Sequence, residues 1–210
     1  MIAGYIYGVV LNDRAELESI GDGLCRDPYK APPNAPVVYI KPRMTASTGG
    51  APVPVPGGVE ELVLSPTIGL IFGRSVARGE SNPLSAVSAM CLAIDVSLPE
   101  MDYYRPAIRQ RCRDGFLPLG NPVPFENPTG LEITTRVEGA IVHHWSLDRL
   151  QRSVKTLVAD LTDFMTFEAG DMLLVGLPGD APRARTNAEV RVEATGIPPI
   201  VTRLAAEMAA

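Results

Sequence analysis

The stretch AIDVSLPEMDYYRPAIRQRCRDGFLPLG, residues 93–120, crowds acids, bases and aromatic residues together more than any other part of the chain. Neither a helical nor an alternating apolar period fits this stretch. Its polar side chains are therefore not arranged simply to cover a core. We interpret the stretch as the floor of an active site.

The composition around this stretch predicts a β-rich protein. The chain has 210 residues, of which 46% are hydrophobic and 20% charged, as is usual for a globular protein. Twenty prolines and nineteen glycines divide it into short segments, which favours many short strands and few helices, an α+β class. No repeat or linker divides the chain, so we expect one domain, with a smaller N-terminal part that ends in a loop (1–58) and a main body (59–210).

Charge and cysteine content exclude several kinds of partner. A net charge of −5 offers no basic surface for a phosphate backbone, so nucleic acid is not expected to bind. The apolar opening MIAGYIYGVVL lacks a basic leader region and is too short to span a bilayer, so it predicts a buried strand and no membrane contact. The widely spaced cysteines match neither a disulfide framework nor a zinc site and suggest a reducing cytoplasm: Cys25, Cys91 and Cys112.

Lys41 is the first charged residue that the pattern places at a strand end. It follows the β-branched run 37–40 and precedes Pro42, which cannot continue a ladder. We expect its amine to be free at the strand end, where it could serve a site, or it could be an ordinary solvated lysine.

The remaining pattern predicts further elements on both sides of the central stretch. Helices are expected over 15–24, 82–94 and 146–164, the last because Ser146 can cap an apolar stripe. Other segments read as strands: 4–11, two strands within 61–73 interrupted by Ser65-Pro66-Thr67, a hairpin over 131–145 with its turn at Glu138-Gly139, 172–175, and 188–204.

The common catalytic motifs are absent from the sequence. There is no Ser-His-Asp order, P-loop or dinucleotide fingerprint. The two histidines, His143 and His144, are neighbours on an expected strand and should face opposite sides, so they do not make a metal pair. A structural or surface role is the simpler interpretation of both.

The central stretch itself offers the chemistry. Asp95 and Glu100 are candidate proton-transfer carboxylates, and guanidinium groups of this density suit a dianionic substrate. A network of structural ion pairs in a long loop is the alternative. The candidate substrate-binding residues are Lys41, Arg43, Tyr104, Arg105, Arg111 and Arg113.

Three runs, 103–108, 112–116 and 118–120, together with Ser-Leu-Pro-Glu at 97–100 and Ile-Lys-Pro-Arg at 40–43, resemble the fumarylacetoacetate hydrolase family. The resemblance covers nearly the whole chain. It implies a fold of layered, rolled mixed sheets with a few helices, and a 2-oxo or 2-hydroxy dicarboxylic acid as substrate.

The family resemblance also implies Mg²⁺ or another divalent cation, held by a Glu-x-Glu motif and a later aspartate. Here Ser65 and Thr67 occupy the glutamate positions, and only Asp95 remains. One carboxylate is too few for a hard cation that prefers six oxygen ligands. We therefore expect no tightly bound metal or other cofactor.

Other positions of the family pattern have changed as well. By resemblance, the active-site lysine falls at Arg111, the threonine of a late Gly-Thr-Pro motif at Leu177, and a loop histidine near Arg14 or Glu16. An arginine keeps its charge but cannot act as a base near neutral pH. The anion-binding side, in contrast, is retained.

Within the family, the resemblance is to enzymes that isomerise or decarboxylate the carboxymethyl-muconate-derived diacids of 4-hydroxyphenylacetate (homoprotocatechuate) degradation. The expected activity is therefore isomerase or decarboxylase, as a homodimer or as a heterodimer with a homologous subunit. Two alternatives stay open: a catalytically silent partner of a metal-bearing homologue, and an acylpyruvate-type C–C hydrolase, which would need the metal.

Overall fold

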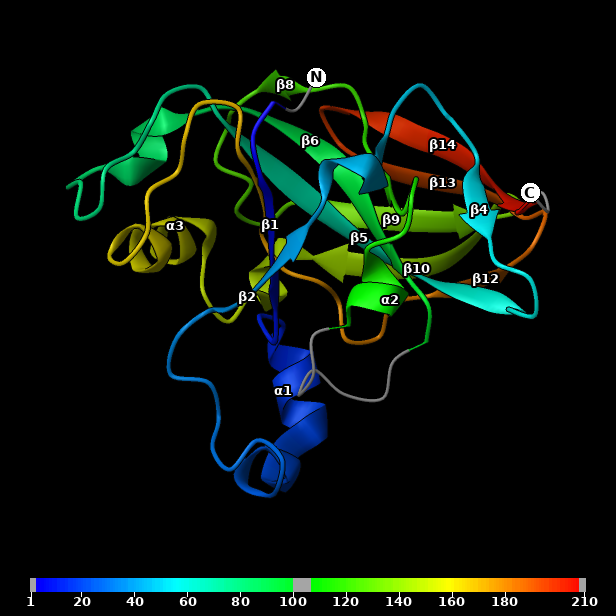
Figure 1. The fold of residues 1–210 in the computed structure, drawn as a ribbon, viewed down its shortest axis with the longest axis horizontal. Coiled ribbons are helices and arrows are strands. Elements are labelled where there is room, and N and C mark those ends of the chain that lie inside the picture. Colours follow the sequence, from blue (N-terminus) through cyan, green and yellow to red (C-terminus); the bar gives the residue numbers. More distant parts are fainter. Residues whose placement is uncertain (1–2, 100–106, 208–210) are drawn as a thin grey trace.

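A computed structural model describes residues 3–99 and 107–207 of the chain. Two large sheets lie one over the other, with short helices at the periphery (Figure 1). The helices are α1 (Arg14–Ile20), α2 (Ile108–Arg111) and α3 (Val154–Thr162), with 3₁₀ turns η1 (Gly21–Cys25), η2 (Arg43–Thr45), η3 (Pro83–Ala86) and η4 (Leu147–Arg149).

The larger sheet has seven strands in the order β2-β1-β11-β5-β6-β8, with β12 also paired to β5. It is mixed, because β1 and β11 are parallel while the other neighbours are antiparallel. Its strands are β1 (Ile6–Val10), β2 (Val37–Lys41), β5 (Glu61–Phe72), β6 (Val87–Ser97), β8 (Val123–Pro124), β11 (Met172–Leu174) and β12 (Arg183–Arg185).

The second sheet has five strands in the order β10-β9-β13-β14-β4. The predicted hairpin β9–β10 is confirmed: Glu138 and Gly139 both have positive φ angles, of 51° and 81°, as a two-residue hairpin turn requires. The strands are β4 (Val53–Val55), β9 (Glu132–Val137), β10 (Ala140–Ser146), β13 (Glu189–Ala194) and β14 (Ile197–Ala206); β3 (Ala46–Ser47) and β7 (Leu117–Pro118) form a separate pair.

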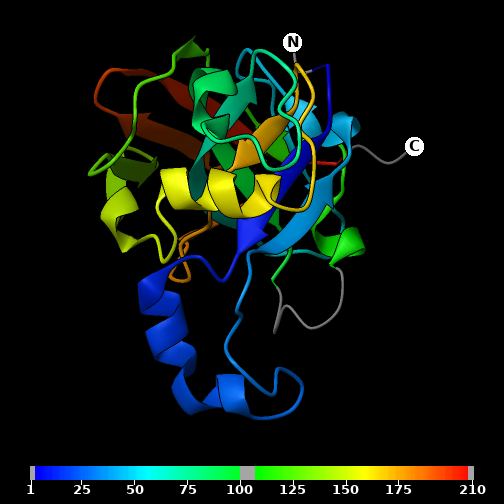
Figure 2. The same cartoon turned by 90° about the vertical axis from the view of Figure 1, so that its left-hand side faces the viewer.

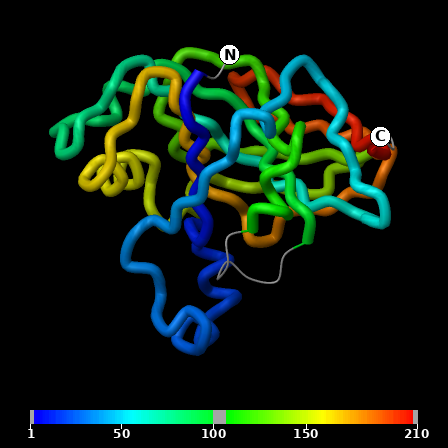
Figure 3. Tube along the Cα trace, in the orientation of Figure 1, coloured from blue at the N-terminus to red at the C-terminus, as the bar shows by residue number. Residues whose placement is uncertain are grey.

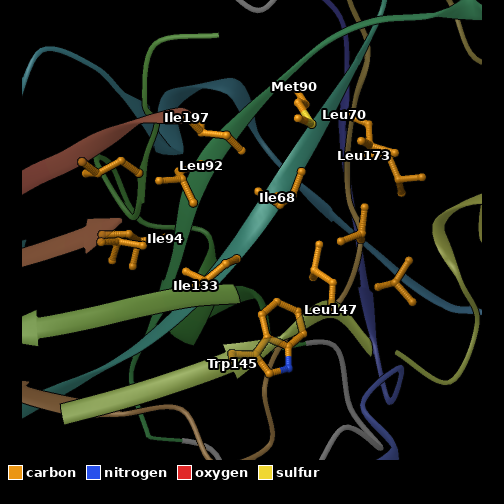
Figure 4. Packing of buried hydrophobic residues seen from close by; sticks show 14 of the residues in the cluster. Ile68, Leu70, Met90, Leu92, Ile94, Ile133, Trp145, Leu147, Leu173 and Ile197 are labelled. Carbon is orange, nitrogen blue, oxygen red and sulfur yellow. The ribbon is translucent and has the colours of Figure 1, made fainter. Parts of the chain in front are cut away.

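The main core fills the space between the two large sheets (Figure 4). Because successive side chains of a strand point to opposite faces, alternate residues of β5 and β6 enter this core. Ile68 and Leu70 from β5, and Leu92 and Ile94 from β6, meet Ile133, Trp145 and Ile197 from the second sheet. The buried face of α3 joins the same core from the side that faces the viewer in Figure 2.

The other face of the seven-stranded sheet carries two smaller apolar clusters. One is built around Ile6, Cys91, Ala93, Leu117, Leu119, Met172 and Leu174. The other, here called the β1-end cluster, consists of Val10, Leu11 and Leu177, against which Leu17, Ile20, Tyr29, Val37 and Tyr39 pack. This second face also carries the charged side chains described below.

One helix prediction was wrong, and a second placed the start of its helix too early. Residues 82–94 form only the short turn η3 and then enter β6. This run lacks an alternating pattern because both faces of β6 are buried. In 146–164, β10 extends to Ser146, and the helix α3 begins only after Ser153, whose side chain caps it.

The prediction of two strands within 61–73 was also wrong, since β5 runs unbroken through Pro66. On one side of β5, β12 pairs with residues 61–63 and β11 with residues 69–71. Pro66 lies between these pairings, where its missing N–H disrupts neither ladder.

The first 58 residues do not fold apart from the rest. β1 pairs with β11, and β4 pairs with β14, so both large sheets contain strands from the two ends of the chain. The segment from α1 to residue 36 extends away from the sheets in the ribbon and the tube (Figures 1 and 3). The predicted division into parts 1–58 and 59–210 stays a prediction.

Candidate active site

Asp95 is the centre of the site. It lies near the end of β6, on the face of the sheet opposite the main core, and its side chain is 0% exposed. Its neighbour across the ladder is Ser65 of β5, which is also buried. An ionised carboxylate at this depth needs partners, because transfer from water is costly.

Two cations and one phenol supply those partners. Lys41 Nζ lies 2.9 Å, and Arg111 Nη1 3.1 Å, from the same Asp95 oxygen, Oδ1. The hydroxyl of Tyr39 donates to the other oxygen, Oδ2. These four side chains come from β2, α2 and β6, and we call them the Asp95 cluster.

Lys41 is held by more than the carboxylate. As the last residue of β2 it is 1% exposed, and its amine also donates to the carbonyl oxygens of Val96 at 3.3 Å and Phe116 at 2.9 Å. The prediction that Lys41 occupies a strand end is thus confirmed, but the prediction that its amine is free was wrong, because the buried amine donates to three protein oxygens. Its predicted contact with substrate stays a prediction.

The charges of the cluster shift one another's protonation. Burial alone would raise the pKa of Asp95, but Lys41 and Arg111, with the hydrogen bond from Tyr39, outweigh it and hold the pKa below its usual value. Burial lowers the pKa of Lys41, an effect that Asp95 partly offsets. The resting carboxylate is therefore charged near neutral pH.

Tyr39 is a site residue that the sequence analysis missed. Its ring lies over Gly8 of the neighbouring strand, where an added Cβ would come within 2.2 Å of the ring. The Arg111 guanidinium lies 5.5 Å from the ring centroid, a distance typical of a cation–π contact. A glycine in the middle of a strand, at position 8, was the available signal of such a close approach.

The positions of the family's glutamates do not suit a divalent cation. Ser65 and Thr67 line the same face as Asp95, but both carry neutral hydroxyls, and Thr67 donates its proton to the carbonyl of Gly176 at 2.6 Å. Asp95 itself already accepts bonds from two cations. Within the described residues, no three carboxylate, histidine or cysteine side chains are grouped for a metal. This donor set does not fit Mg²⁺ or Mn²⁺.

Of the remaining predicted residues, the structure describes Arg43 and Arg113, and neither belongs to the Asp95 cluster. Arg113 pairs with Glu207 at 3.1 Å, and Arg43 is exposed, with Nη1 3.4 Å from the carbonyl of Ala3. Glu100, Tyr104 and Arg105 lie outside the described residues. Of the predicted set, Lys41, Asp95 and Arg111 meet.

The two histidines behave as predicted for neighbours on a strand. His143 faces inward, is 9% exposed and lies 3.1 Å from Asp180, whereas His144 is exposed. Neither is part of the Asp95 cluster.

Comparison with known proteins gives a consistent family assignment. The family model described as fumarylacetoacetate (FAA) hydrolase C-terminal matches residues 5–205. The 4-hydroxyphenylacetate degradation bifunctional isomerase/decarboxylase of Escherichia coli is 39% identical over 198 residues, which cover 94% of this chain and 46% of the relative. The chain therefore spans about half the length of the curated relatives that it matches.

Solved structures share the fold. The 5-carboxymethyl-2-hydroxymuconate delta-isomerase of Mycobacterium smegmatis superposes with a TM-score of 0.83 at 20% identity, covering 100% of this chain and 81% of that one. Fumarylpyruvate hydrolase of Pseudomonas aeruginosa, crystallised with Mn²⁺ and pyruvate, gives 0.80 at 17% identity, covering 97% and 90%. Through residues 3–99 and 107–207, no helix is long and apolar enough to cross a membrane.

Proposed function

We propose, from the premise that the chain belongs to the fumarylacetoacetate hydrolase family, that it acts on a 2-hydroxy or 2-oxo dicarboxylic acid of 4-hydroxyphenylacetate catabolism. The observation that carries the proposal is the 39% identity to the bifunctional isomerase/decarboxylase across 94% of this chain. The reaction is the proton shift between the enol and keto isomers of the diacid.

In this reaction the enol oxygen loses its proton and becomes a carbonyl. The diene electrons shift along the chain, and the carbon at the far end of the diene takes up a proton. The step is balanced without an oxidant or a reductant. It requires groups that bind two carboxylates and a route by which a proton can move.

The Asp95 cluster supports both requirements. Arg111 brings a guanidinium to the site, and Lys41 keeps Asp95 charged and in place. Tyr39 is partly exposed whereas Asp95 is not, so in this proposal a proton reaches Asp95 past the Tyr39 hydroxyl. Glu100 remains a second proposed proton carrier, with Arg43, Tyr104, Arg105 and Arg113 as further carboxylate-binding residues.

The donor set favours the proton shift over decarboxylation or C–C hydrolysis by this chain. In the family, a divalent cation supplies Lewis-acid chemistry to those reactions, and the side chains around Asp95 do not fit one.

The partner is proposed to be a second copy of the chain or a homologous subunit.

The test is turnover of the enol diacid by the purified chain, followed by its ultraviolet absorbance with and without a chelator. We expect turnover that the chelator leaves unchanged. Arg111→Gln should reduce kcat/KM at least about tenfold, as expected for the loss of a charge-assisted hydrogen bond, whereas Arg74→Gln, in an exposed pair with Glu80, should not. Rapid CO₂ release that depends on Mg²⁺ would contradict the proposal.

A silent partner subunit is the second candidate, favoured by the observation that the chain covers only 46% of the relative's length. It predicts no turnover by the chain alone, and turnover once a metal-bearing homologue is added. The same assay, with and without that homologue, separates the two functions.

A further inference from the structure

A second ionic network lies outside the Asp95 cluster. Arg149, from the turn η4 after β10, donates through Nε to Asp13 at 3.0 Å and through Nη1 and Nη2 to Asp180 at 3.1 and 2.9 Å. Asp180 also meets His143 Nε2 at 3.1 Å. Asp13 is 0% exposed, so this network is more than a surface ion pair.

The network fastens two segments to each other. Asp13 caps helix α1 by accepting from the backbone of Ala15, and it also accepts from the backbone N–H of Gly179 at 2.9 Å. Asn12 donates to the carbonyl of Val175 at 2.8 Å. The beginning of α1 and the turn 175–180 are thereby joined.

The turn 175–180 fits closely against α1. A Cβ at Gly179 would lie 2.4 Å from the Cβ of Glu16, and one at Gly176 would lie 2.9 Å from Leu150. Gly176 also has a φ of 154°. A side chain larger than glycine at either position would therefore displace the turn from Glu16 or Leu150.

The same turn also contacts the β1-end cluster and strand β5. Leu177 is buried in the β1-end cluster, against which the ring of Tyr39 packs. The carbonyl of Gly176 accepts the Thr67 hydroxyl. Arg149 is thus connected to Tyr39 through the turn and the β1-end cluster, and Tyr39 contacts Asp95 directly.

We propose that Arg149 is a positioning residue for this site: by joining Asp13 to Asp180, it sets the turn 175–180 and, through Leu177, the place of Tyr39 beside Asp95. The inference rests on the proposed function where it concerns turnover. It assigns Arg149 no contact with substrate. Its fork of donors suits the task, because it engages two carboxylates at once.

The experiment compares Arg149→Met and the conservative Arg149→Lys with the control Arg74→Met, which removes an exposed two-pronged pair with Glu80. The structural readouts are amide exchange at Gly179 and the NMR signals of the Tyr39 ring, identified by their loss in Tyr39→Phe. We expect Arg149→Met to speed exchange at Gly179 at least about tenfold and to shift the Tyr39 signals. Arg149→Lys should do so less, and the control should do neither.

The functional readout is a double-mutant cycle between Arg149→Met and Tyr39→Phe. We expect Arg149→Met to lower kcat about tenfold with KM changed less than about threefold. In the Tyr39→Phe background, the same substitution should lower kcat less than about twofold, because its effect passes through Tyr39.

Unchanged Tyr39 ring signals, or losses in kcat that simply multiply, would overturn the inference. If Arg149→Met does not fold, Arg149→Lys carries the same comparison. If the parent chain shows no turnover, the proposed function fails, while the exchange and NMR results still decide whether Arg149 positions Tyr39.

Discussion

Ile94 and Asp95 are neighbours on β6, equally buried, and their surroundings are opposite. Ile94 points into the main core between the sheets, where its neighbours are apolar. Asp95 points to the other face, where two cations and a phenol surround one carboxylate. One face depends on filled volume and the other on compensated charge, so the same strand is stabilised in two different ways.

The largest expected effect is that of Asp95→Ala. The substitution leaves the buried ammonium of Lys41 without its anion, so we expect the free energy of unfolding to fall by about 4 kcal/mol. Urea denaturation measures this loss. The double variant Asp95→Leu with Lys41→Met should recover at least half of the loss, because it removes the carboxylate together with the more deeply buried of its two cations. If the double variant is no more stable than Asp95→Ala, charge compensation does not dominate this face.

The next effect is that of Ile94→Ala, which should cost about 3 kcal/mol because it leaves a cavity in a well-packed core. The same denaturation measurement applies. Removing a charge elsewhere should not restore the stability that Ile94→Ala loses. The loss caused by Lys41→Met should simply add to the loss caused by Ile94→Ala. A strong interaction between Ile94→Ala and Lys41→Met would show that the two faces are not separate.

The smallest effect comes from acid. The pKa of Asp95 is lowered in the folded state, so the stability that its charge contributes is present above the unfolded value of about 3.9 and is lost as pH falls through the folded value. Protonation keeps the carboxyl group in place, so the loss should be smaller than for either substitution. Urea midpoints should fall less steeply below about pH 4 in Asp95→Asn than in the parent. Ile94→Val, the matched control, should keep the parent's slope, and equal slopes in parent and Asp95→Asn would refute the assignment.

Local signals allowed much of the fold to be predicted. The turn at Glu138-Gly139 fixed the hairpin β9–β10, and the family resemblance correctly indicated layered mixed sheets. The sequence of β6 predicts a helix, because a strand buried on both faces has no alternating pattern. The sequence predicts a break at Pro66 because it does not reveal that the neighbouring strands leave a gap beside this residue.

The site was harder to predict than the fold. Lys41, Asp95 and Arg111 were recognised as candidates, but each was assigned on its own, and their mutual pairing depends on contacts between β2, β6 and α2. Tyr39 was missed because an alternating strand gives no reason to single out one tyrosine. Arg149 was missed because its partners, Asp13 and Asp180, lie 136 and 31 residues away in the sequence.

The glycine beneath Tyr39 has a consequence for how this sequence can change. An added Cβ at position 8 would meet the Tyr39 ring at 2.2 Å, so even alanine is incompatible with that ring in its present place. The two positions are therefore coupled: a larger residue at 8 requires the Tyr39 ring to move or residue 39 to become smaller. A lineage that made that exchange would also lose the phenol that binds Asp95.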